Sequence, residues 1–116
     1  MTPESLAYHA SLMRQVLDGH VGRENAIPVA ELAPLIGLRA NRDYRDVREV
    51  RDLIEEDYPV LSDSTGMWRY EDPEEAEVVM ASLHKTAKTI LRRYARIRRQ
   101  KRRRFPHWQP RLWRAA

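Results

Sequence analysis

The apolar residues in the first half of the chain recur at helical spacing in three successive segments. The first segment opens with Thr2-Pro3, an N-cap followed by proline at the first helical position, and predicts a helix to about Asp18. A short second helix is predicted over residues 30–36 and a third over residues 42–56. Their core-facing side chains are those of Leu6, Met13, Val16 and Leu17, of Leu32, Leu35 and Ile36, and of Tyr44, Val47, Val50 and Ile54.

The links between these helices contain turn and capping residues. Gly19 ends the first helix, and residues 25–29 are limited by their proline to a single edge strand or an extended link. Gly37 supplies the turn before the third helix, and Asn41 is a good N-cap for it. Two helices joined by a short glycine turn indicate a helix-turn-helix motif.

Beyond the third helix the pattern becomes that of a β-hairpin. Pro59 stops the helix, residues 60–62 and 67–70 are strand-like, and residues 63–66 have the composition of a turn. The order helix, short strand, helix, helix, strand, turn, strand predicts a mainly α fold with a small β-hairpin wing, which is a winged helix-turn-helix.

A long C-terminal helix follows the hairpin. Asp72-Pro73 begins it, and it should continue to about Arg103. We expect part of its apolar seam to pack on the first helix through Leu6, Met13 and Leu17, and the rest to form a homodimer contact. The alternative is a monomer whose final turns are solvated. The seam residues, spaced alternately four and three apart, are Ala76, Met80, Leu83, Ala87, Ile90, Tyr94 and Ile97.

Charge divides the chain into two parts. Residues 1–91 hold 10 of the 21 Lys and Arg and all 17 Asp and Glu, a formal charge of −7. Residues 92–116 hold the other 11 basic residues and no acid, a formal charge of +11. We therefore separate a winged-helix domain (1–91), which includes the start of the last helix, from a basic helix end with a Trp-containing arm (92–116). This basic part indicates an anionic partner, first of all nucleic acid.

Side chains that would support catalysis or metal binding are absent or scattered. The chain has no cysteine, so it has neither a disulfide nor a thiolate metal site. Its four histidines have no ligand spacing, it lacks a Gly-rich phosphate loop, and the carboxylates around Asp72 are explained by helix capping. We expect no enzyme activity, no cofactor and no metal. Since a long apolar run and a signal-peptide pattern are both missing, we expect a cytoplasmic location and no membrane partner.

Four motifs resemble those of the small winged-helix DNA-binding proteins of phages and prophages. They are Val47-Arg48-Glu49-Val50, Tyr58-Pro59-Val60-Leu61-Ser62, Thr65-Gly66-Met67-Trp68-Arg69-Tyr70 and Glu74-Glu75-Ala76. The resemblance covers residues 27–99 and implies a transcription or replication regulator of a phage or mobile element, acting in a bacterial or phage-infected cell. Three residues depart from the usual family pattern. Met67 replaces the usual tyrosine, Arg51 stands where an apolar residue is common, and Asp57 stands where glycine often ends the recognition helix.

Three regions are candidates for contact with double-stranded DNA. The start of the third helix would enter the major groove, where arginine reads guanine; Asn41 could read adenine, although capping is its simpler role. The wing would contact phosphates, and the basic helix end would supply most of the affinity through counterion release. The candidate residues are Asn41, Arg42, Arg45 and Arg48 in the third helix, Ser64, Thr65 and Arg69 in the wing, and Arg92, Arg93, Arg96, Arg99, Lys101, Arg102, Arg103 and Arg104 in the helix end.

The acids of the third helix leave an alternative function open. Its arginines could belong to a solvated face on which Arg45 pairs with Glu49 and Arg48 with Asp52. These acids would also repel phosphate, which favours a protein–protein interaction module on the same scaffold. An inhibitor or adaptor of RNA polymerase or of a replication factor is an example.

The tryptophans of the C-terminal arm have three alternative roles. Trp108 and Trp113 could pack back on the body, stack on bases or dock a partner protein. Packing is the simplest of the three. Phe105-Pro106-His107 is expected to end the last helix, and residues 107–116 are expected to be extended.

Overall fold

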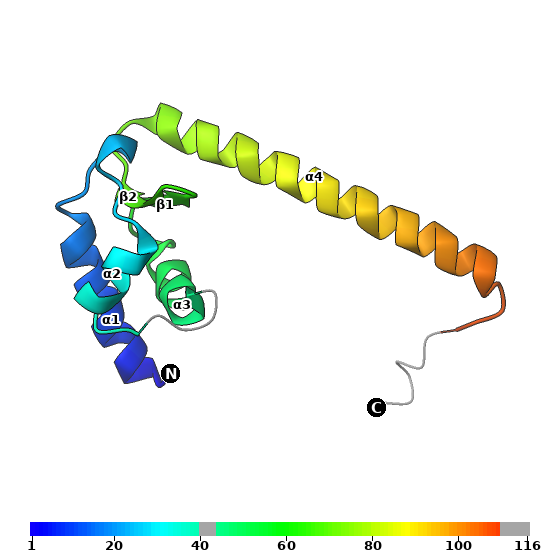
Figure 1. Cartoon of the computed structure of the whole chain (residues 1–116), viewed down its shortest axis with the longest axis horizontal. Helices are drawn as coiled ribbons and strands as arrows, with labels where there is room; N and C mark the ends of the chain where they lie inside the picture. The colour runs from blue at the N-terminus through cyan, green and yellow to red at the C-terminus, as the bar shows by residue number, and fades with distance from the viewer. Residues whose placement is uncertain (40–43, 110–116) are drawn as a thin grey trace. The chain divides into compact units, whose positions relative to one another are not determined.

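The computed structural model describes residues 1–39 and 44–109 (Figure 1). The chain divides into two units, Met1–Met80 and Ala81–Ala116. The prediction of a mainly helical chain with a small hairpin and a long last helix is confirmed. The elements in chain order are α1 (Pro3–Leu17), the 3₁₀ turn η1 (Arg23–Asn25), α2 (Val29–Leu35), α3 (Arg45–Ile54), β1 (Val60–Asp63), β2 (Gly66–Arg69) and α4 (Pro73–Arg104).

The helices α1 and α2 lie where their patterns predict them, but Leu35, predicted on the apolar face of α2, is 56% exposed because that face is formed by Leu32, Ala33 and Ile36. α1 begins after the N-cap Thr2, whose hydroxyl accepts a hydrogen bond of 3.1 Å from the backbone N–H of Ser5. α2 ends at Leu35, because Ile36 has left the α-helical region with φ −103° and ψ 13°. His9 of α1 donates from Nδ1 to the carbonyl of Ile36 at 2.6 Å, so the turn after α2 is tied to α1.

The start of α3 differs from its prediction. The helix begins at Arg45 rather than Arg42, because Tyr44 has a left-handed backbone (φ 51°, ψ 41°) that a right-handed helix does not include. The predicted N-cap Asn41 and the predicted groove residue Arg42 lie outside the described residues. The predicted core face is confirmed, since the three apolar residues that follow Tyr44 on this face are fully buried.

The link between α1 and α2 forms no named strand. The turn η1 occupies its middle, and one residue on either side of η1 pairs with β2: Val21 with Arg69, and Ile27 with Met67. The predicted edge strand over residues 25–29 is therefore reduced to a single bridging residue. The reason is that η1 precedes Ile27 and a proline, which has no backbone N–H to donate, follows it.

The hairpin of β1 and β2 is confirmed. The strands are antiparallel, with Asp63 opposite Gly66 and a two-residue turn between them. Successive side chains of a strand point to opposite faces, yet Met67 and Trp68 are both at most 1% exposed. The hairpin is therefore covered on both faces.

The core lies among α1, α2, α3 and the hairpin. α1 packs against all three, and its residues Met13 and Leu17 are fully enclosed there. All the buried core residues lie in the unit Met1–Met80, and none of those in the described residues belongs to α4. The packing of the α4 seam on Leu6, Met13 and Leu17 therefore stays a prediction. The core residues are Ala10, Met13, Leu17, Ile27, Leu32, Ala33, Ile36, Val47, Val50, Ile54, Val60, Met67 and Trp68.

Gly66→Ala should destabilise the fold. Gly66 has φ +138°, and a Cβ there would lie 2.6 Å from the carbonyl carbon of Ile27 and 2.9 Å from the nitrogen of Pro28. The substitution should cost about 2–4 kcal/mol in backbone strain and overpacking, measured by urea unfolding. Gly19→Ala is the matched control, since its Cβ would meet only the carbonyl oxygen of Val16 at 3.5 Å. Equal losses in the two variants would contradict the argument.

Candidate nucleic-acid interface

The outer face of α3 carries two of the arginines predicted to read DNA. Arg45 is the first residue of the helix and Arg48 lies one turn further on, so their side chains share a face, and both are exposed. The opposite side of the helix is held in the core by Val47 and Val50. The structure therefore brings Arg45 and Arg48 together on the solvent side of the helix.

This outer face also carries negative charge. Glu49 and Asp52 are exposed beside the arginines, and α3 with the three residues after it holds three arginines against six acids. In the described part of the chain, no ion pair joins Arg45 to Glu49 or Arg48 to Asp52. The predicted pairs are thus not formed, but the local field of the acids still opposes a phosphate.

Arg51 links α3 to the hairpin. Its Nη1 donates to the hydroxyl of Ser62 in β1 at 3.1 Å, its Nη2 lies 3.0 Å from Asp52 Oδ1, and its Nε lies 3.7 Å from Glu55 Oε2. The winged-helix family that the sequence resembles has an apolar residue at this position. These three contacts show how a half-buried arginine is accommodated there instead.

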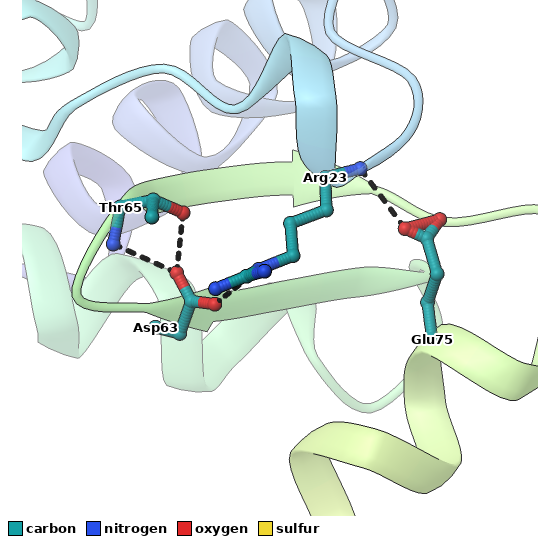
Figure 2. Close-up of polar contacts among 4 residues, drawn as sticks. All are labelled: Arg23, Asp63, Thr65 and Glu75. Atoms are coloured by element: carbon teal, nitrogen blue, oxygen red, sulfur yellow. Dashed lines mark hydrogen bonds and ion pairs between the residues drawn. The ribbon is translucent and has the colours of Figure 1, made fainter.

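The turn of the hairpin is organised around the carboxylate of Asp63. Thr65 donates to its Oδ1 from the backbone N–H, at 2.8 Å, and from the hydroxyl, while Arg23 Nε donates to its Oδ2 at 2.8 Å (Figure 2). The backbone N–H of Arg23 donates in turn to Glu75 Oε2 at 2.9 Å. The Thr65 hydroxyl, predicted to hold a phosphate, is therefore engaged within the protein, whereas Ser64 is exposed.

These contacts set the charge state of the turn. Partial burial of the Asp63 carboxyl opposes its ionisation. The hydrogen bonds from Thr65 and Arg23, together with the charge of Arg23, outweigh burial and lower the pKa of Asp63 below its ordinary value of 3.8. At neutral pH the turn therefore contains a carboxylate tied to a guanidinium.

Arg69, the predicted phosphate ligand of β2, belongs to a second network. Its Nη1 donates to Asp18 Oδ1 at 3.0 Å, its guanidinium carbon lies 5.8 Å from the centre of the Tyr58 ring, and its Nε is buried without a hydrogen-bond partner among the described residues. Tyr58 donates to the same Asp18 oxygen at 2.6 Å. Burial and the contact with Asp18 raise the pKa of Tyr58 to about 12. Arg69 is thus paired with Asp18 and holds β2 against the end of α1.

The larger, C-terminal part of α4 contains no acid, because Glu77 is the last acid of the chain. All nine basic residues between positions 92 and 104 are exposed. Side chains three or four residues apart share one face of a helix, and six exposed basic residues follow this spacing. This basic row consists of Lys85, Lys88, Arg92, Arg96, Arg99 and Arg103. It extends over about 27 Å of helix. The other predicted cations lie elsewhere around the helix and are Arg93, Lys101, Arg102 and Arg104.

The chain turns back on itself at the end of α4. The backbone N–H of Phe105 donates to the carbonyl of Lys101 at 2.8 Å, and that of Trp108 donates to the carbonyl of Phe105 at 3.1 Å. Lys101 Nζ lies 4.7 Å from the centre of a Trp108 ring, which is a cation–π distance. Trp108 therefore packs on the end of its own helix and stays half-exposed. Trp113 lies outside the described residues.

The pattern of the sequence missed the role of Arg23. This residue lies in η1, 40 positions from Asp63, and no periodic signal marks it. An aspartate at the start of a turn does indicate that donors will gather around it. Which cation pairs with that aspartate, however, depends on the path of the link after α1 past the hairpin.

The described residues also bear on metal binding and membrane insertion. Residues 1–39 and 44–109 contain no group of three or more His, Cys, Asp or Glu that could hold a metal ion. None of the helices described is both long and apolar enough to cross a membrane.

Comparisons with protein-family models, with curated proteins and with solved structures found no match to the chain. The resemblance to phage winged-helix proteins therefore rests on the residues of the chain itself.

Asp63→Asn should remove a pH-dependent part of the stability. Because the pKa of Asp63 is lowered on folding, its carboxylate stabilises the fold fully above about pH 5, and this contribution is lost as the pH falls through the lowered pKa. Thermal unfolding between pH 7 and pH 3 should therefore show a smaller decrease in Tm for the variant than for the native chain. Asp57→Asn, at an exposed ion pair of 3.4 Å with Arg14, should keep the native decrease. Equal decreases in the native chain and Asp63→Asn would contradict the assignment.

Proposed function

We propose that the protein binds double-stranded DNA as a winged helix-turn-helix regulator of transcription or replication, of the kind found in phages and mobile elements. In this proposal α2 and α3 form the helix-turn-helix, α3 enters the major groove, and the hairpin is the wing. The observation that carries the proposal is the basic row of α4. It places six exposed cations on one helix face within a segment that has no acid.

The basic row would supply affinity without sequence preference. Duplex DNA carries one phosphate charge per roughly 1.7 Å of its axis, and cations that neutralise phosphates release bound counterions. The face of α3 is poorly suited to this task, because α3 with the three residues after it holds six acids against three arginines. Holding the DNA is therefore the task of α4 in this proposal.

Base recognition would belong to the start of α3. Arg45 and Arg48 share the exposed face, and an arginine can donate two hydrogen bonds to the edge of a guanine. The carboxylate of Glu49 beside them is an acceptor that fits the amino group of cytosine. Acids on this face then add selectivity, because a carboxylate that finds no donor is repelled by the DNA.

The wing would contribute more to positioning the protein on the DNA than to the binding affinity. The Thr65 hydroxyl and Arg69 are engaged within the protein. Ser64 is exposed, and the Arg23 side chain is more than half exposed although it pairs with Asp63. Contacts of this kind fix the register of a protein on the DNA backbone without reading sequence.

A protein–protein interaction module is the second candidate, and the acids of α3 favour it. An exposed face with Glu49 and Asp52 is complementary to a basic partner surface. The half-exposed Trp108 is the type of side chain that anchors protein interfaces. An inhibitor or adaptor of a DNA-dependent enzyme would combine both features.

Replacing Arg92, Arg96, Arg99 and Arg103 by glutamine should weaken binding to every duplex sequence. Each lost phosphate contact should lower the slope of log K against log salt concentration by about 0.9, hence by up to about 3.6 in total. Fluorescence anisotropy with a random duplex at several salt concentrations measures this slope. Arg14→Gln, which removes one cation from α1, should leave it almost unchanged. A native slope in the fourfold variant would show that the basic row does not hold phosphates.

Arg45→Ala should reduce specificity more than overall affinity. A target is first selected from random duplex DNA with the purified protein. On that target the variant should lose about 1–3 kcal/mol of binding free energy, with little loss on unrelated DNA. Arg14→Ala is the control on α1, and Arg48→Ala repeats the test on the same face. If Arg45→Ala and Arg48→Ala both bind the target normally, the regulator gives way to the interaction module.

A further inference from the structure

The large apolar residues of the α4 seam are exposed. Its five large residues are between 52% and 65% exposed, and Ala87 lies among them. The alternation of four and three residues keeps them on one stripe of the helix, which is the repeat of a coiled coil. An exposed apolar stripe of this length marks a surface that another molecule covers. The five residues are Met80, Leu83, Ile90, Tyr94 and Ile97.

The basic row lies on the other side of the same helix. At 100° per residue, Lys85 and Arg92 are about half a turn from Leu83 and Ile90. A partner on the seam would therefore leave the basic row open to solvent or to DNA. The two surfaces of α4 can be occupied at the same time.

We propose that the seam pairs with the same seam of a second copy of this chain, with the two helices antiparallel. The argument rests on charge. In a parallel heptad pair, Arg93 of one copy flanks the seam beside Arg98 of the other, and the two acid-free helix ends lie together. In an antiparallel pair, Glu77 of each copy lies beside Arg98 of the other. The reversal thus replaces two like-charge contacts by two opposite-charge contacts.

The side-chain sizes agree with an antiparallel register. With Glu77 beside Arg98, Met80 of one copy faces Ile97 of the other and Leu83 faces Tyr94. Near the centre the small Ala87 faces Ile90, so a small residue meets a large one. Each contact occurs twice by symmetry. The seam is therefore filled from Met80 to Ile97 without two large residues colliding at the centre.

The association is tested on the full chain in the absence of DNA, so its outcome is separate from that of the proposed function. Sedimentation equilibrium should show a monomer–dimer equilibrium. Leu83→Lys and Ile90→Lys together should abolish the dimer at all concentrations tested. Because α4 contributes no residue to the core, circular dichroism and thermal unfolding should confirm that residues 1–80 remain folded in this variant.

Charge exchange tests the orientation. Glu77→Arg and Arg98→Glu should each weaken the dimer by about fivefold to tenfold, and the double variant should restore it. Arg92→Glu, on the outer face of the same helix, is the control that should not weaken it.

Three results would overturn the proposal. The first is a native chain that stays monomeric at high concentration. The second is an Arg98→Glu dimer that becomes tighter, because the glutamate would then meet Arg93 of a parallel partner, with no restoration in the double variant. The third is a monomer that binds vesicles containing phosphatidylserine through Leu83 and Ile90, since the seam would then be a membrane surface.

Discussion

Four backbone hydrogen bonds between β2 and the link after α1 determine how the hairpin sits on the helices. Two join Ile27 and Met67, at 2.8 and 3.0 Å, and two join Arg69 to His20 and Gly22, at 2.9 Å each. β2 and the link come this close only because Gly66 of β2 faces the link, where a Cβ would overlap the backbone of Ile27 and Pro28. The side-chain contacts that surround the hairpin depend on this backbone register.

The arginines of the body are divided between structure and surface. Arg23, Arg51 and Arg69 each bond the hairpin to another segment, through Asp63, Ser62 and Asp18 respectively. Their guanidinium groups form these contacts where β1 and β2 meet the rest of the fold. The cations left to the surface of α3 are few, and the acids beside them reduce their effect on a distant phosphate. Because three arginines are engaged in contacts of the hairpin, few remain on the body to attract a phosphate.

Local signals predicted the elements, and long-range contacts explain most of what they missed. The Asp72 cap is confirmed, since its carboxylate accepts the N–H of Glu74 at 3.0 Å, and such a bond depends on adjacent residues only. The left-handed backbone of Tyr44 could not be predicted, because this residue fits the helical spacing of the apolar residues that follow it. The exposure of the α3 arginines could be predicted from the same period. The pairing of Arg69 with Asp18 could not, because 51 positions separate them.

The order of charges along the chain bears on how such a body could act on DNA. Beyond Glu77 the only charged residues are basic, whereas α3 with the three residues after it carries an excess of acid. Under the proposed function, α4 holds the DNA and so raises the effective concentration of α3 at the groove. A reading helix of weak intrinsic affinity is then an advantage, because it leaves mismatched sites quickly while the protein stays bound to the backbone. A second copy joined through the seam would add another such reader and leave both basic rows free.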